Sequence, residues 1–290
     1  MSNPKEIKRR ILSIESVIKT TEAMKMISIV KLRKIKNLLI QIKIYLDYIE
    51  TILLDLLFME KYKENLSNNQ YFTKIGKEKM KLFIVFTSDR GLCGSFNSSI
   101  FEKINFIFHK KGYNENECVF LSVGKKGFDF LCGKYNMYNQ DLIENNFLNK
   151  KIQSLTSELI SDFIQKKFSA IYLIYNHLKK SLLQETIIEK FLPISIKNLK
   201  KKTSKIYSIL EPDQKKILNL LIPKFLNTKL LKTFLESTTA EHTSRMISMH
   251  KATENAYDIK HDLILNYNKE RQTAITKEIL EIISGSESLK

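Results

Sequence analysis

Residues 231–263 read LKTFLESTTAEHTSRMISMHKATENAYDIKHDL. Apolar or small residues recur there at alternating steps of four and three, as in a coiled-coil seam rather than the broader stripe of a globular helix. No glycine or proline interrupts the chain from Leu226 until Gly285. A helix of this length would reach about 90 Å, so it needs a partner along its seam. The seam positions are Leu231, Leu235, Thr238, His242, Arg245, Met249, Ala252, Ala256, Ile259 and Leu263.

The partner is predicted at the opposite end of the chain, where residues 3–60 carry a second seam of the same spacing. Asn3 can cap this helix, and Pro4 suits its first turn. A heptad repeat sustained over such a length is a strong indicator of a coiled coil. The seam positions, apolar except for the consecutive Thr21, Lys25 and Ser28, are Ile7, Ile11, Ile14, Ile18, Thr21, Lys25, Ser28, Leu32, Ile35, Leu39, Ile42, Leu46, Ile49, Leu53 and Leu56.

The two seams match if the helices run antiparallel. We prefer the register that places Ile14 opposite Ala256, because large residues then meet small ones and the helices can interdigitate. The same register groups polar residues together and sets Lys25 opposite Arg245. Registers one heptad away satisfy the spacing equally well, so the choice depends on matching size to size and polar to polar.

In this register residues 264–290 extend past the N-terminus as a single helix. An isolated helix is only marginally stable in water, and an exposed apolar face marks a site of interaction. The tip is therefore expected to bury its apolar face in something outside this chain. The apolar positions are Ala274, Ile275, Ile279, Ile282 and Ile283.

Residues 80–200 change character, because short apolar runs alternate with amphipathic stretches. That alternation predicts an α/β domain of Rossmann-like type with a mostly parallel sheet, inserted between the two long helices. The fold class is therefore α+β overall. Strands are predicted at Met80–Thr87, Cys118–Val123, Ala170–Tyr175 and Thr186–Leu192, and helices at Ser98–Lys111 and Leu155–Lys167.

Two features mark where the inserted domain gives way to the last helix. A basic run, Lys197–Lys205, leads out of the domain. Glu211 and Pro212 are then predicted to start a short helix that Pro223 ends or kinks. The resulting division has an N-terminal coiled-coil helix at 1–62, a polar linker at 63–79, the inserted α/β domain at 80–205, and a C-terminal coiled-coil helix with its projecting tip at 206–290.

The chain is strongly basic, with a formal net charge of +17 and a pI of about 9.5. Such a charge favours an acidic partner, which could be a protein, a nucleic acid or anionic lipid. A compositional bias toward lysine, isoleucine and asparagine would produce the same charge without any partner. Both interpretations stay open on the composition alone.

The cysteines and the hydropathy pattern indicate the cellular environment expected for the chain. Cys93, Cys118 and Cys132 lie far apart and lack metal-type spacing, which favours a reducing compartment. The N-terminus shows neither an apolar signal core nor an Arg- and Ser-rich transit stretch. No run of about 18 apolar residues is present, so no membrane span is predicted.

The stretch Thr87–Asn97 reads TSDRGLCGSFN, follows a predicted strand and precedes a predicted helix. Glycine-rich turns in that position can cradle a phosphate. This turn lacks both Gly-Lys-Ser/Thr and the G-x-G-x-x-G pattern. We therefore interpret it as a structural turn in which Gly91 and Gly94 allow positive φ.

The residue types of catalytic and metal sites are scattered along the chain. No HExxH motif occurs, and no Ser/His/Asp or Cys/His arrangement can be argued from the spacing. We predict no catalytic residue, no bound cofactor and no metal site. The histidines are His109, His177, His242, His250 and His261.

Several motifs together resemble a known family. Residues 18–27, IKTTEAMKMI, with Lys31-Leu32-Arg33, resemble the N-terminal signature of the gamma subunit of bacterial-type F-type ATP synthase. Residues 87–97 are similar to that family's strand-end motif, and residues 240–256 follow its long C-terminal helix. Residues 271–285, RQTAITKEILEIISG, resemble its closing signature. The resemblance runs nearly from end to end.

The resemblance implies a central rotor shaft that is not itself an enzyme. The coiled coil would sit inside a ring of alternating alpha and beta subunits. The inserted domain, together with the epsilon subunit, would rest on the c-subunit ring of the membrane sector. Proton flow would turn the shaft and drive each catalytic site through its states. The chain would bind no nucleic acid and would be peripheral on the cytoplasmic face of the bacterial cell membrane, attached only through the complex.

The resemblance also implies two contact zones with the alpha/beta ring. In one, Met24, Lys25 and Arg245 would meet the acidic lever loops of the catalytic subunits, which would let Lys25 and Arg245 tolerate each other. In the other, near the tip, side chains would hydrogen-bond the surrounding ring. The residues of this second zone are Arg271, Gln272, Thr276 and Glu281.

Two other function classes fit the residues without the resemblance. A basic antiparallel coiled coil could be a clamp for nucleic acid, which would retain DNA or RNA in a strongly salt-dependent way. Alternatively, the α/β domain could belong to a nucleotide-dependent enzyme. Equilibrium dialysis of the isolated chain against ATP or NAD would distinguish the enzyme from the shaft.

Overall fold

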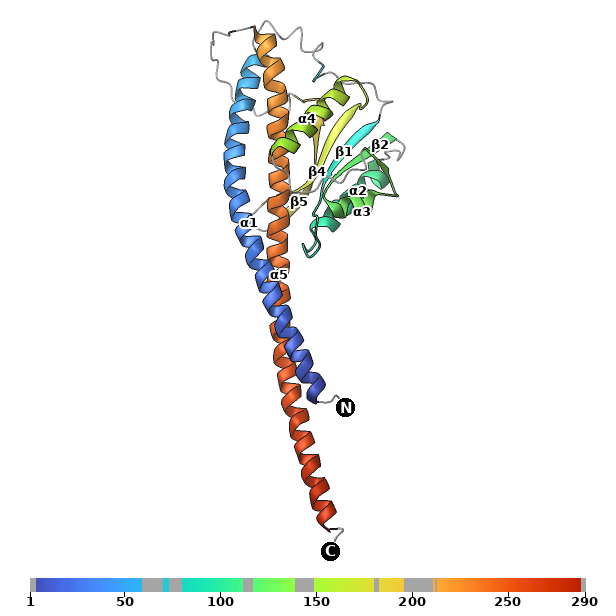
Figure 1. Cartoon of the computed structure of the whole chain (residues 1–290). Coiled ribbons are helices and arrows are strands. Elements are labelled where there is room, and N and C mark those ends of the chain that lie inside the picture. The colour runs from blue at the N-terminus through green and yellow to red at the C-terminus, as the bar shows by residue number, and fades with distance from the viewer. Residues whose placement is uncertain are drawn as a thin grey trace. The chain divides into compact units, whose positions relative to one another are not determined.

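The computed structural model describes residues 4–58, 70–72, 80–111, 117–138, 149–179, 183–195, 211 and 213–287 (Figure 1). It divides into two compact units. One is formed by Met1–Val30 with Arg245–Lys290, and the other by Lys31–Ser244. Two long helices contribute to both units. They are α1, Pro4–Phe58, with 55 residues, and α5, Gln214–Glu287, with 74 residues.

The predicted seam along α1 is confirmed. Every seam position from Ile7 to Leu56 is buried or half-buried, while most side chains between them are exposed. In the larger unit, Leu46 and Leu53 share one core with Leu226 of α5. The N-terminal and C-terminal segments therefore pair with each other, as their matched spacing predicts.

A five-stranded sheet lies in the larger unit, in the order β3-β2-β1-β4-β5. Strands β1 to β4 pair in parallel, and β5 is antiparallel to β4, which confirms the mostly parallel sheet. β3 was not predicted, because two residues are too short to show any periodicity. The strands are β1, Lys81–Phe86; β2, Cys118–Val123; β3, Asn136–Met137; β4, Ala170–Leu178; and β5, Gln184–Leu192.

Helices cover both faces of this sheet (Figure 1). Leu82 and Ile84 of β1 pack in one core with α4, α1 and α5. Phe83 and Val85 alternate with them and pack in a second core with α2 and α3. Burial on both faces explains why β1 reads as a continuous apolar run. The covering helices are α2, Phe96–Lys111; α3, Lys125–Leu131; and α4, Asn149–Ile164.

Of the two outcomes predicted at Pro223, a helix end is wrong, because α5 runs through the proline from Gln214 onward, while a kink there stays a prediction. Proline removes one backbone hydrogen bond and crowds the preceding turn, which normally favours ending a helix. Here Ile222 and Phe225 on either side of the proline are almost fully buried in the core. Tertiary packing of this apolar face outweighs the local cost.

The proposed domain boundaries remain predictions. Residues 59–69, 73–79 and 196–210 lie outside the described residues, and with them most of the linker and the basic run Lys197–Lys205. The side chain of His109 also lies outside the described part of the chain.

Candidate partner-binding surfaces on the terminal helices

The smaller unit pairs the start of α1 with the second half of α5 through three polar contacts. The Thr253 hydroxyl donates to Thr21 Oγ1 at 2.8 Å. On the flanks, Tyr257 OH donates to Glu22 Oε1 at 3.0 Å, and Lys260 Nζ lies 2.9 Å from Glu15 Oε1. The Lys260 ammonium lowers the pKa of the Glu15 carboxyl, and the bond to Glu22 raises the pKa of the Tyr257 phenol.

These contacts correct the preferred register. Thr21 meets Thr253 rather than Met249, so the helices are displaced by about one turn from the predicted pairing of Ile14 with Ala256. Size matching could not separate the two registers, because Ala252, Thr253 and Ala256 are all small. The hydroxyl pair and the flanking ion pair favour the observed one.

The seam of α5 also has a different phase in this unit. Ile259, predicted in the seam, is 49% exposed. Lys260 takes the inner position instead and pairs with Glu15. The observed register places Met249, rather than Arg245, at the level of Lys25, which removes the predicted opposition of two cations.

The residues of the first predicted contact zone are partly shielded by the chain itself. Met24 and Lys25 are half-buried on α1, and Arg245 is buried, with 8% of its surface exposed. Ser28, in the polar layer, is buried and donates to the carbonyl of Met24 at 2.8 Å. A partner at this zone would meet Met24 and Lys25 more readily than Arg245.

The residues of the second zone lie together on the exposed end of α5. From position 271 to 286 every side chain is exposed except the half-buried Ala274. Thr276 donates to the carbonyl of Gln272 at 2.9 Å, and Lys277 Nζ lies 3.7 Å from Glu281 Oε1. Of the apolar positions predicted at the tip, Ile275, Ile279, Ile282 and Ile283 are exposed, and so is Leu280, which was not predicted.

Such an end is unusual for a free surface. A helix that is not packed is only marginally stable in water, and large exposed apolar side chains in a continuous stretch mark a binding surface. The polar groups of Arg271, Gln272 and Thr276 lie beside these apolar residues. The arrangement can therefore bind a concave surface that has an apolar wall and hydrogen-bonding groups.

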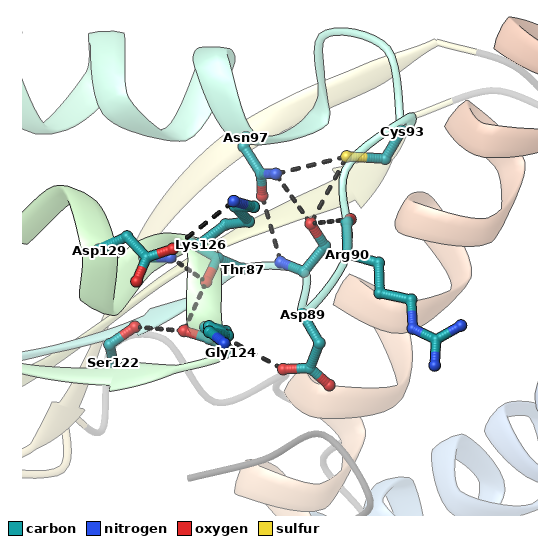
Figure 2. Close-up of polar contacts among 12 residues, drawn as sticks. Thr87, Asp89, Arg90, Cys93, Asn97, Ser122, Gly124, Lys126 and Asp129 are labelled. Atoms are coloured by element: carbon teal, nitrogen blue, oxygen red, sulfur yellow. Dashed lines mark hydrogen bonds and ion pairs between the residues drawn. The ribbon is translucent and has the colours of Figure 1, made fainter. Parts of the chain in front are cut away.

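The loop after β1 was the other candidate site, and its own side chains hold it (Figure 2). Asn97 accepts a hydrogen bond from the Ser88 N–H at 3.1 Å and donates to Ser88 Oγ at 2.8 Å and Cys93 Sγ at 3.3 Å. The Ser88 hydroxyl donates to the carbonyl of Arg90 at 2.9 Å. Ser244 of α5 donates to the carbonyl of Cys93 at 2.6 Å, so the loop is also attached to α5.

The first amides of α3 are used inside the same network. A phosphate at this turn would need free backbone N–H groups. Here oxygens of the turn accept those bonds from α3, and at the start of α2 the Phe96 N–H donates to the Cys93 carbonyl at 3.3 Å. These internal bonds favour a structural turn over a phosphate cradle. The bonds from α3 are Lys125 N–H to Asp89 Oδ1 at 3.2 Å, Lys126 N–H to the Ser88 carbonyl at 3.0 Å, and Gly127 N–H to Thr87 Oγ1 at 2.9 Å.

The glycines of this region differ in part from the prediction. Gly94 has the expected positive φ of 58°, but Leu92, with φ of 62°, takes the other left-handed position instead of Gly91. The glycine that matters most was not predicted. Gly124 has φ of 111°, and a Cβ there would lie 2.2 Å from the Thr87 carbonyl oxygen. The requirement for glycine at position 124 follows from the close contact between the ends of β1 and β2, which the sequence alone does not show.

Within the described ranges, the remaining reactive groups form no evident site. The three cysteines are free, with Cys93 and Cys118 buried and Cys132 exposed. Burial raises the pKa of the Cys118 thiol to about 11, so it stays protonated near neutral pH. Among the described residues, no group of three or more His, Cys, Asp or Glu side chains could hold a metal ion. Nor does any helix in the described part of the chain have the length and apolar character needed to cross a bilayer.

Comparison with known proteins places these features in a family. A family model described as ATP synthase matches residues 3–289. The ATP synthase gamma chain of Azobacteroides pseudotrichonymphae is 36% identical, over 100% of this chain and 100% of that protein. The ATP synthase gamma chain of Christiangramia forsetii is 35% identical, over 100% of this chain and 99% of that protein.

Solved structures share the fold. The rotor of the Euglena gracilis mitochondrial ATP synthase aligns with a TM-score of 0.61 at 12% identity, over 94% of this chain and 98% of that one. A chain in the OSCP/F1/c-ring structure of the same enzyme aligns with a TM-score of 0.62 at 13% identity, over 99% and 94%. The full-length match to the family model and the identity to curated gamma chains agree with the fold. The chain belongs to the ATP synthase gamma-chain family.

Proposed function

We propose that this chain is the central rotor shaft of an F-type ATP synthase, which couples proton flow through the membrane sector to ATP synthesis or hydrolysis. The observation that carries the proposal is the exposed apolar end of α5, from Arg271 to Ser286, which needs a surrounding partner. Membership of the gamma-chain family and the likeness to the rotor and F1/c-ring structures of the Euglena gracilis enzyme support the same role.

The partners follow from this role. The end of α5 would turn inside a ring of alpha and beta subunits, and the sheet-containing unit would contact the epsilon subunit and the c-subunit ring. The chain would be held at the cytoplasmic face of a bacterial membrane only through these contacts. Its net charge of +17 suits acidic partner surfaces.

We assign no catalytic step to this chain. The turn most similar to a nucleotide-binding loop, Thr87–Asn97, is held by internal hydrogen bonds, in which oxygens of Thr87, Ser88 and Asp89 accept from the first amides of α3. A nucleotide phosphate at the start of α3 would have to displace those bonds before it could bind. The partner subunits of the complex would therefore bind the nucleotides.

The predicted contact residues keep their proposed roles. Arg271, Gln272, Thr276 and Glu281 would hydrogen-bond the ring, and their exposure on one segment supports this role. Met24 and Lys25 would meet the lever loops of the catalytic subunits. Arg245, being buried, would support that zone from within the chain and contact the loops less directly.

The proposal is tested by assembly. The chain is expressed with an affinity tag in its own cells, and the purified complex is analysed for subunit content and ATP hydrolysis. We expect alpha, beta, epsilon and c subunits in fixed ratio with the chain. A chain that purifies alone, or with nucleic acid that dissociates steeply as salt is raised, would contradict the proposal and favour the basic clamp.

A further inference from the structure

The helix pair of the larger unit is attached to the sheet by an apolar core that has a definite end. On α1 the buried part of this core begins at Leu39, and on α5 it ends at Leu235. Apolar packing is non-directional, so by itself it resists separation better than sliding. The contact of α5 with the sheet-containing unit continues past this point through Ala240 in the second core and through the Ser244 bond to the Cys93 carbonyl. A force that turns the helices against the sheet would therefore load the stretch of α5 around Leu235.

A buried carboxylate lies at that point. Glu236, the residue after Leu235, is only 5% exposed. Its Oε1 lies 2.7 Å from Lys43 Nζ of α1, and its Oε2 lies 3.3 Å from His177 Nδ1 of β4. One carboxylate therefore joins α1, α5 and the sheet. A buried charge is tolerated only when it is paired in this way.

A second attachment lies about two turns earlier on α5 and faces the same edge of the sheet. Lys229 Nζ lies 2.8 Å from Glu189 Oε1 of β5, and Tyr175 OH of β4 donates to Glu189 Oε2 at 3.1 Å. Lys229 thus bonds the helix to β5, and Glu236 bonds it to β4. Unlike apolar packing, these charge-assisted bonds have a fixed direction and a fixed register.

We propose that Glu236, with Lys43 and His177, is a mechanical latch that keeps the helix pair from sliding on the sheet when torque passes between them. The inference rests on the proposed rotor function, because only a rotating shaft would load this joint. Glu236 acts as a positioning residue and contacts no nucleotide. Its removal should weaken the coupling of proton movement to hydrolysis more than it weakens hydrolysis itself.

The test uses the complete complex with Glu236→Gln, which keeps the size of the side chain and removes its charge. Glu185→Gln is the matched control, since Glu185 is also on this edge of the sheet but is 55% exposed in its pair with Lys179. Lys43→Met is a second variant, which removes the partner cation at a position that is itself 41% exposed.

Three quantities are measured for each complex: ATP hydrolysis without an opposing gradient, the steady pH gradient that ATP-driven pumping sustains, and hydrogen exchange of α5 amides near position 236. We expect hydrolysis close to wild type, a lower sustained gradient, and exchange that is about ten-fold faster, the size expected for one lost charge-assisted bond. Glu185→Gln should match wild type in all three.

Two outcomes separate the latch from the rotor itself. If the wild-type complex pumps protons, and both Glu236→Gln and Lys43→Met sustain the wild-type gradient, the latch is refuted while the rotor function stands. If the wild-type chain forms no pumping complex at all, the proposed function fails first. A fall in hydrolysis and gradient by the same factor would also overturn the latch, because a merely structural role would lower both together.

Discussion

Glu189 shows how single charges stabilise the attachment of α5 to the sheet. Burial raises the pKa of its carboxyl, but Lys229 and Lys232 and the Tyr175 hydroxyl outweigh burial and bring the pKa below its ordinary value of 4.5. A folded-state pKa below the unfolded one means that the charged form stabilises the fold. This contribution is present above pH 4.5 and is lost as the pH falls through the lowered folded-state pKa.

We therefore expect Glu189→Gln to lower the free energy of unfolding near neutral pH and to make it less dependent on pH in the acidic range. Urea unfolding near pH 7 and near pH 4 measures both effects. The exposed Glu185→Gln should leave both quantities unchanged, since exposed pairs contribute little. Equal losses of stability on acidification in wild type and Glu189→Gln would show that the pair with Lys229 does not stabilise the fold.

Gly124 and Gly91 differ in the space that each position leaves for a side chain. A Cβ on Gly124 would meet the Thr87 carbonyl carbon at 2.7 Å and its oxygen at 2.2 Å, at a φ that side chains rarely adopt, whereas a Cβ on Gly91 would meet nothing within 4 Å. Gly124→Ala should cost about 1–3 kcal/mol of stability through strain and crowding, and Gly91→Ala should be close to neutral. Thermal unfolding of both variants tests this. Equal melting temperatures would mean that the ends of β1 and β2 can separate freely.

Among the elements, the helix pair of the smaller unit offers a direct test of register. Cysteines at 21 and 253 replace two side chains whose hydroxyls lie 2.8 Å apart, so the two thiols would lie within reach of each other. We expect rapid cross-linking of this pair under mild oxidation in a chain that also carries Cys132→Ser, because Cys132 is the exposed native thiol. Cysteines at 21 and 249 are the control and should join more slowly. The reverse order would restore the register first predicted from size matching.

Whether a segment is a helix or a strand was predictable where an apolar repeat continues over many turns, or where both faces of a strand are buried. The seam of α1 repeats over many turns, and β1 is apolar throughout because both of its faces are covered. The continuation of α5 through Pro223 could not be predicted in this way. It depends on packing of Ile222 and Phe225 against elements distant in the chain, which local propensity does not include.

The candidate sites were also predictable to different degrees, because a local pattern can be read in the sequence whereas contacts between distant residues cannot. The exposed end of α5 follows from the sequence, because its apolar positions continue beyond any partner helix in the chain. The attachment at Glu236 does not, since Lys43, His177 and Glu236 are far apart in sequence and each resembles an ordinary surface residue. Only the fold brings them together. Resemblance to a family supplied the roles of Arg271 and Gln272, which spacing alone leaves open.

In the whole molecule, the proposed function requires a transmitted force, and Arg271 and Gln272 would be among the residues that pass it to the ring. Both are exposed on α5 next to the apolar positions that need an outside partner. Inside a ring that excludes bulk water, a guanidinium can make a bidentate pair with a carboxylate, and the amide of Gln272 can bridge backbone groups. Charge-assisted bonds of this kind contribute about 1.5–3 kcal/mol each.

Replacement of both residues by alanine should therefore reduce ATP hydrolysis of the reconstituted complex by about ten-fold or more, since the loss of one such bond is worth about that factor. Assembly should be normal, because the contacts that pair α1 with α5 in the smaller unit, from Thr253 to Lys260, are untouched. Subunit ratios by gel densitometry and hydrolysis rates are measured on the same preparations. Glu278→Gln, on the same exposed segment, is the control and should behave as wild type. If the double variant hydrolyses ATP and pumps protons at wild-type rates, Arg271 and Gln272 do not transmit the force. Thr276, Glu281 and the apolar face of α5 would then have to transmit it.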